Sequence, residues 1–226
     1  MLASCAFKKS VFFSFGMLSI GFLIWTAGGP TRAQVLGLIQ TQAAQSEGGV
    51  GFPQPPGSRF PDAEHFFLTD QGSHLPVFNW LVPPEEYDAF ARKSDKRFRE
   101  RYTLTSTSPP TAQSNCHGWV FLQGKFLIFA EQVERILREN GYRPVAEPKV
   151  GDVIIYRDPS GTILHSGLVW WVGTDGQTLI HSKFGISGRY LHSPSEQPYG
   201  ERFSYYRADR RRHSVRVRSA ESAVQP

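Results

Sequence analysis

Three residues of this chain have the types and the order that nucleophilic catalysis at sulfur requires: Cys116, His165 and His181. Cys116 is the only cysteine outside the N-terminal leader, because the other of the two is Cys5. A thiolate can attack a carbonyl carbon, but it needs a histidine that accepts its proton and later protonates the leaving group. That histidine needs a polar group that fixes its orientation. We therefore predict Cys116 as the nucleophile, His165 as the base and His181 as the orienting residue.

The residues before Cys116 predict that it begins a helix. Ser114 and Asn115 are good N-cap residues, so Cys116 falls in the first turn of the segment CHGWVFLQ, residues 116–123. The backbone N–H groups and the helix dipole at that position favour a thiolate and lower the thiol pKa. The same N–H groups can hold the oxyanion that forms on a carbonyl under attack. The competing interpretation of an unpaired cysteine is a small buried hydrophobic residue.

The two histidines lie on neighbouring segments with strand-like patterns, ILHSGLVWWV and TLIHSKF. A three-residue loop, 174–176, places His165 and His181 on one face of the sheet, with His181 opposite Val169. A four-residue loop places them on opposite faces. In the first register, a strong twist or a bulge must close the remaining gap between the two side chains.

Other residues are alternatives for parts of this site. His117 is a rival base by proximity, but as the next residue of a helix it points about 100° away from Cys116. Asp152 and Ser182 are further polar partners for a histidine, and Asp152 also suits the start of a strand.

A zinc site is a third interpretation of the same cysteine and histidines, since Cys116, His165 and His181 are acceptable ligand types. The sequence has no Cys-x-x-Cys or His-x-x-x-His pair to support such a site. It also has no glycine-rich phosphate loop and no dinucleotide-binding motif. We therefore expect neither a metal nor another cofactor.

The N-terminus has the pattern of a secretory signal peptide, residues 1–33. Lys8 and Lys9 precede the apolar run 11–27, and the small residues Thr31 and Ala33 follow it. The alternative is a retained membrane anchor, because the run is only slightly shorter than the roughly 20 residues that span a bilayer. Both interpretations place the rest of the chain outside the cytoplasm, in a secreted, periplasmic or cell-envelope location.

The charge distribution argues against a nucleic-acid-binding domain. The 226 residues have a formal net charge of +5, but the excess lies in the leader and in the last twenty residues. A nucleic-acid-binding fold carries its basic residues on the folded body. We interpret residues 207–226 as a solvated, flexible tail, with attachment to an anionic envelope surface as the alternative. The tail contains six arginines: Arg207, Arg210, Arg211, Arg212, Arg216 and Arg218.

The hydrophobic pattern predicts a Gly/Pro-rich linker over 34–61 and one α+β domain over 62–206. Helices are expected first and an antiparallel sheet after them. The expected helices are 84–102, 116–123 and 130–142, after a short hairpin over 65–80, and a polar loop is expected over 105–115. The expected strands are 151–158, 163–173, 177–184, 188–191 and 202–207, with the last two completing a meander.

The segments SNCHGWVF, GDVIIYRDPSGTILHSGLVW and LIHSKFG together resemble the NlpC/P60 group of papain-like cysteine hydrolases. The resemblance implies a papain-like fold and amide hydrolysis outside the cytoplasm, commonly of peptidoglycan stem peptides. It implies that Cys116 is the nucleophile, His165 the base and acid, and His181 the orienting residue. Asn115 and His117 stand where that family has Asp and Ser.

The sequence thus supports two functions of different classes. The first is an exported cysteine peptidase or amidase that acts on a peptide or on peptidoglycan, with acyl transfer as a chemical variant. The second is a non-catalytic cell-envelope binding domain that keeps the papain-like shape. The sequence specifies no oligomeric state.

Overall fold

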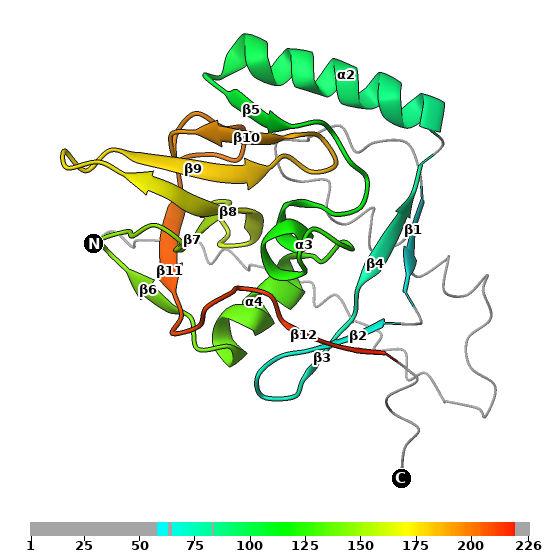
Figure 1. Ribbon diagram of the computed structural model, residues 1–226, viewed down its shortest axis with the longest axis vertical. Helices are drawn as coiled ribbons and strands as arrows, with labels where there is room; N and C mark the ends of the chain where they lie inside the picture. The colour runs from blue at the N-terminus through cyan, green and yellow to red at the C-terminus, as the bar shows by residue number, and fades with distance from the viewer. Residues whose placement is uncertain (1–57, 63–64, 83, 220–226) are drawn as a thin grey trace, which may run out of the picture. The chain divides into compact units, whose positions relative to one another are not determined.

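The computed structural model describes residues 58–62, 65–82 and 84–219 (Figure 1). All of these residues belong to one compact unit within Gly51–Pro226. The predicted signal peptide and the linker up to residue 57 therefore lie outside the described residues. Among the residues that are described, no helix is both long enough and apolar enough to cross a membrane.

A seven-stranded antiparallel sheet forms the centre of the domain, as predicted for an α+β chain. Its strand order is β5-β10-β9-β8-β7-β11-β6, and each pair of neighbouring strands is antiparallel. The order β7-β8-β9-β10 is the expected meander, but β11 pairs with β7 instead of extending the sheet beside β10. The strands are β5 (Thr105–Ser108), β6 (Arg143–Val145), β7 (Val153–Arg157), β8 (Ile163–Val172), β9 (Thr178–Lys183), β10 (Arg189–His192) and β11 (Phe203–Arg207).

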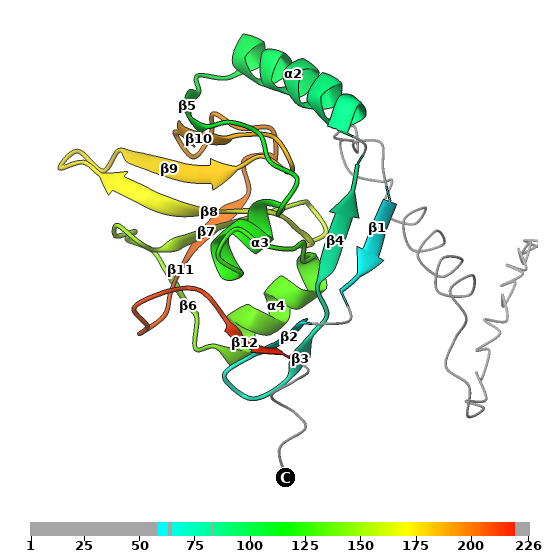
Figure 2. The same ribbon diagram turned by 45° about the vertical axis from the view of Figure 1, so that its right-hand side comes forward.

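Three helices lie at the positions expected from the hydrophobic pattern. They are α2 (Pro84–Arg101), α3 (Cys116–Phe121) and α4 (Ala130–Glu139). Gly141 has a positive φ of 70°, as a glycine that ends a helix should. In Figure 2, α2 lies along β5 and β10, while α3 and α4 lie beside β7 and β8.

The two faces of the sheet bury different hydrophobic clusters. On one face, Val153 and Ile155 of β7 pack with Phe121 of α3 and Ile136 of α4. On the other face, Ile154 and Tyr156 of β7 pack with Val169, Ile180 and side chains of β11. This alternation follows from the period of two in a strand. A residue's position along β8 or β9 therefore decides whether its side chain faces α3.

Two short sheets include residues that the sequence analysis assigned differently. The expected hairpin forms between β2 (His65–Leu68) and β3 (His74–Leu75). The next segment, β4 (Phe78–Leu81), pairs instead with β1 (Ser58–Pro61), so the last residues of the predicted linker are a strand. The predicted polar loop over 105–115 begins with β5, which pairs with β10 at the edge of the large sheet.

The prediction of a flexible tail from residue 207 is wrong for residues 207–219. Arg207 ends β11, and its guanidinium donates to both carboxylate oxygens of Asp152, at 2.8 and 2.7 Å. Val215 is only 4% exposed and belongs to the main core cluster. Strand β12 (Arg216–Ser219) then pairs with β2. The arginine content suggested solvation, but the Arg207–Asp152 ion pair, the buried Val215 side chain and the pairing of β12 with β2 hold this segment on the domain.

Replacing Val215 by alanine should lower the free energy of unfolding by about 2 kcal/mol, between the usual core costs of Ile→Val and Leu→Ala. The matched control is Val217→Ala, since Val217 lies on the same segment and is 58% exposed. The control should change stability by less than about 0.5 kcal/mol. Urea denaturation measures both variants, and equal effects would show that the segment is not docked in solution.

Candidate functional site

Asn115 fixes the start of α3 from both sides. Its side-chain oxygen accepts a hydrogen bond from the Gly118 backbone N–H at 2.9 Å, as predicted for an N-cap. Its side-chain nitrogen donates to the Ile128 carbonyl at 2.6 Å. Gly118 lets the chain fold back closely, because a Cβ there would lie 2.0 Å from the Phe126 carbonyl oxygen. Cys116 is consequently the first residue of a helix held on both sides.

The Cys116 sulfur lies where β9 separates from β8. The β8–β9 pairs run from Val172–Thr178 to Gly167–Ser182, whereas β8 continues to pair with β7 beyond that point. The backbone N–H groups of Ser166 and His117 interact with the sulfur. The cysteine is 5% exposed, so the start of α3 presents its thiol to the sheet and away from solvent.

Burial dominates the ionisation of this thiol. It raises the pKa of Cys116 to about 11, while the Ser166 and His117 backbone N–H groups and the charge of Lys183 lower it by less. The expected depression of the thiol pKa at the helix start is therefore wrong for this arrangement. At neutral pH the group is a thiol.

His165 is a fully buried imidazole without a hydrogen bond. Its exposed fraction is 0%, and neither Nδ1 nor Nε2 has a partner among the described residues. Its ring stacks on Tyr199 with centroids 3.8 Å apart and planes within 4°. Tyr156 and Phe184 complete the surroundings at 5.6 Å each. Desolvation holds the pKa of His165 well below its usual value, so the ring is neutral.

Tyr199 interacts with both the His165 imidazole and the Cys116 thiol. Its ring stacks on His165, and its hydroxyl interacts electrostatically with Cys116. The predicted nucleophile and the predicted base thus share Tyr199 as a neighbour, while His165 pairs with Tyr156 and lies on the sheet face opposite the one that packs on α3. No direct hydrogen bond joins the two among the described residues.

His181 lies on the opposite face of the sheet from His165. The turn itself forms as predicted, since Gly173 N–H donates to Gln177 O at 2.8 Å and Gly176 has a φ of 82°. A bulge at Trp170 then shifts the register by one residue, so that His181 pairs with Leu168 instead of Val169. A shift of one residue turns a strand's side chains to the opposite face of the sheet. The expectation that His165 and His181 share a face is therefore wrong.

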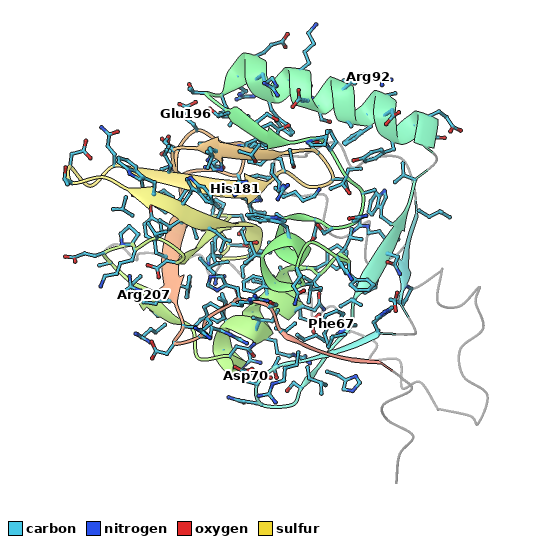
Figure 3. All side chains as sticks on the ribbon, viewed as in Figure 1. Phe67, Asp70, Arg92, His181, Glu196 and Arg207 are labelled. Atoms are coloured by element: carbon cyan, nitrogen blue, oxygen red, sulfur yellow. The ribbon has the colours of Figure 1, made fainter. Side chains whose placement is uncertain are left out.

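The contacts of His181 belong to the α3 side of the sheet. Its Nε2 is 2.8 Å from the Thr107 hydroxyl of β5. Its ring meets Trp119 of α3 edge-on at 4.9 Å and Trp170 at 5.4 Å. Figure 3 shows His181 on β9. The structure therefore provides no contact through which His181 could orient the His165 ring.

Two further histidines form buried pairs with serines around the cluster. His117 Nδ1 is 2.9 Å from the Ser166 hydroxyl, and His192 Nε2 is 2.8 Å from the Ser182 hydroxyl. His192 Nδ1 lies 2.8 Å from the Ser193 carbonyl, which accepts its proton and leaves Nε2 as the acceptor for the Ser182 hydroxyl. Burial lowers the pKa of both His117 and His192 to about 4.

Sequence reasoning missed Tyr199, His192 and Lys183. The burial of Lys183, which is 1% exposed, was detectable from the sequence, because this lysine directly follows the segment LIHS of a predicted strand. No sequence signal pointed to Tyr199, because this residue lies in the polar loop between β10 and β11. Asp152, which the sequence suggested as an alternative partner for a histidine, instead forms an ion pair with Arg207. It also accepts a hydrogen bond from the Lys149 backbone N–H.

The site is closed in this structure. Clefts of about 430 and 410 Å³ open elsewhere on the described surface, and neither is lined by Cys116, His165 or His181. Within the described ranges, no group of three or more His, Cys, Asp or Glu side chains is arranged to hold a metal ion. The zinc interpretation therefore has no geometric support here.

Comparisons with known proteins leave the site to be interpreted on its own. No family model matches the chain, and neither a curated protein nor a solved structure matches it.

The buried histidines predict acid sensitivity. The pKa of His117 and of His192 is about 4 in the folded protein, against about 6.5 when exposed, so the unfolded chain binds more protons between these values. The contribution of these two histidines to stability should be complete above pH 6.5 and be lost towards pH 4, by up to about 2.7 kcal/mol per pH unit for the pair. Urea denaturation at several pH values measures this slope.

His117→Asn keeps a polar atom beside Ser166 and removes one titrating group, so it should reduce the slope by up to about 1.4 kcal/mol per pH unit. His74→Asn removes an exposed imidazole and is the control. A flat stability profile between pH 7 and 5 in the unmodified protein would contradict the neutral, buried state of these rings.

Proposed function

We propose that this protein is an exported thiol hydrolase that cleaves an amide bond, with Cys116 as nucleophile and His165 as base and acid. The observation that carries the proposal is the fully buried His165 ring, whose two nitrogens have no partner among the described residues and which stacks on Tyr199, a tyrosine whose hydroxyl interacts electrostatically with the unpaired thiol at the start of α3. A papain-like arrangement, in which a helix presents a thiol to an antiparallel sheet, is part of the same proposal.

Unpartnered buried polar atoms are rare in folded proteins, because each costs the free energy of its lost hydrogen bonds to water. A core position at β8 could hold an apolar residue at no such cost. The strand keeps an imidazole there, neutral and surrounded by aromatic rings. A neutral imidazole is the form that accepts a proton, which supports a role as general base.

The reaction follows from these two groups. His165 takes the proton of the Cys116 thiol, and the sulfur attacks the carbonyl carbon of the amide. The resulting imidazolium protonates the leaving amine as the C–N bond breaks, which leaves a thioester on Cys116. Water then attacks the thioester, with His165 accepting its proton and returning it to the thiol. The N–H groups of Ser166 and His117, which interact with the sulfur, stabilise its negative charge.

Catalysis requires the cluster to open. Tyr199 lies in the segment between β10 and β11, which crosses from one side of β7–β9 to the other, and its ring covers His165. Displacement of this ring hydrates both groups. Because desolvation is the largest cause of the raised thiol pKa and of the lowered imidazole pKa, hydration moves both towards their usual values and favours proton transfer.

The substrate class and the compartment rest on the sequence. The signal-peptide pattern of residues 1–33 supports export, and the resemblance of the three motif segments supports peptidoglycan stem peptides as substrate. His181 has no place in the proton transfer described here, and its position beside Trp119 supports a role in contacting substrate on the α3 side.

The test is the release of new amino groups from isolated peptidoglycan. Cys116→Ala should abolish activity, and His165→Asn should lower kcat/KM by at least about a thousandfold, since each removes a group that the covalent mechanism requires. His181→Ala should cost less than about tenfold. Circular dichroism checks that each variant is folded. Full activity in Cys116→Ala would refute the proposal.

A non-catalytic envelope-binding domain is the second candidate, and the 5% exposure of Cys116 favours it. In that case the unmodified protein should sediment with isolated cell wall and release no amino groups, and Cys116→Ser should sediment equally well. Failure of both proteins to sediment with wall would remove this candidate. Turnover by the unmodified protein would replace it with the hydrolase.

A further inference from the structure

Lys183, at the end of β9, is a buried ammonium group held by three backbone carbonyls. It is 1% exposed. Its Nζ donates to the carbonyls of Thr111 at 2.8 Å, Gly185 at 2.7 Å and Ser187 at 3.0 Å. An ammonium has three donors, so each one has a partner. No carboxylate pairs with it among the described residues.

Such a lysine is costly to bury. Removal of an ammonium from water disfavours its charged form, and desolvation lowers the pKa of Lys183 to about 7. A purely structural position could hold methionine or leucine of similar volume. We therefore expect both the hydrogen-bond donors and the charge of Lys183 to contribute to the site.

The three carbonyls belong to two segments that meet beside the thiol. Thr111 lies in the loop that leads directly into Cys116, while Gly185 and Ser187 lie in the turn between β9 and β10. The Thr111 backbone N–H also donates to Ile186 O at 3.2 Å. Lys183 thus ties the approach to α3 to the turn that follows β9.

The charge of Lys183 acts on the thiol. Its positive charge favours the thiolate of Cys116, and a thiolate there favours the ammonium in return. The other groups that act on this pair are Arg189 of β10, which disfavours the ammonium, and Tyr199, whose hydroxyl interacts with Cys116. In its ammonium form Lys183 therefore favours ionisation of this sulfur.

We propose that Lys183 is the positioning residue of the Cys116 site: its three hydrogen bonds fix the loop that presents the sulfur, and its charge stabilises the thiolate. This inference rests on the proposed function, in which Cys116 must ionise. It adds a third group to the proposed pair, from the strand that separates from β8.

The charge is tested by alkylation of Cys116 with iodoacetamide between pH 6 and pH 10, in the full chain with Cys5→Ser so that one thiol remains. Lys183→Gln keeps donors for the carbonyls and removes the charge. It should slow alkylation at pH 6, where the ammonium form of Lys183 predominates, by about tenfold, the effect of one unit in thiol pKa. Lys183→Arg keeps the charge and should stay within about threefold. Lys96→Gln, at an exposed lysine of α2, is the matched control.

A merely structural lysine predicts the opposite sign, because a loosened loop exposes the thiol and speeds alkylation. An unchanged or faster rate in Lys183→Gln would therefore overturn the electrostatic role. Lys183→Met removes the donors, and hydrogen exchange of the Thr111 amide should then be at least tenfold faster. Unchanged exchange would overturn the positioning role.

Alkylation needs no substrate, so these results are independent of hydrolysis. A slower rate in Lys183→Gln without any amide cleavage by the unmodified protein would leave the inference standing and refute the proposed hydrolase. Amide cleavage by the unmodified protein, together with an unchanged alkylation rate in Lys183→Gln, would support the proposed hydrolase and overturn the electrostatic role of Lys183.

Discussion

The separation of β9 from β8 after the Gly167–Ser182 pair is the constraint on which the candidate site depends. A continued ladder would use the next backbone groups of β8 in strand pairing. Where the ladder stops, the Ser166 N–H interacts instead with the sulfur at the start of α3. The three carbonyls around the Lys183 ammonium hold the departing end of β9 in place. A break in the sheet thus makes room for a thiol between two strands.

Burial of the polar groups around this break costs considerable desolvation free energy. Cys116, His165, Ser166 and Lys183 are each 5% exposed or less. In so dry a place the electrostatic interactions between them are strong, and charged forms are disfavoured. The resting cluster is consequently neutral at the thiol and at the imidazole. Access of water to the cluster is the physical variable that decides its protonation state.

One inserted residue decides the role of His181. The turn after β8 has the predicted length and the predicted left-handed glycine, yet the bulge at Trp170 moves every later partner by one position. The side chain that was expected beside His165 therefore lies against Trp119 of α3. Bulges depend on the packing of both strands, so the pattern of a single strand cannot locate one.

The amino-acid sequence by itself determined the elements. Asn115 as the cap of α3, the apolar spacing of α4 and the branched and aromatic residues of β7 to β9 are local properties of consecutive residues, and each element was predictable from them. Tertiary structure decided which faces meet, because strand register, the bulge and the docking of Val215 depend on contacts between distant segments. It also decided the ionisation of Cys116. The helix start favours the thiolate, but burial by the rest of the fold outweighs that local effect.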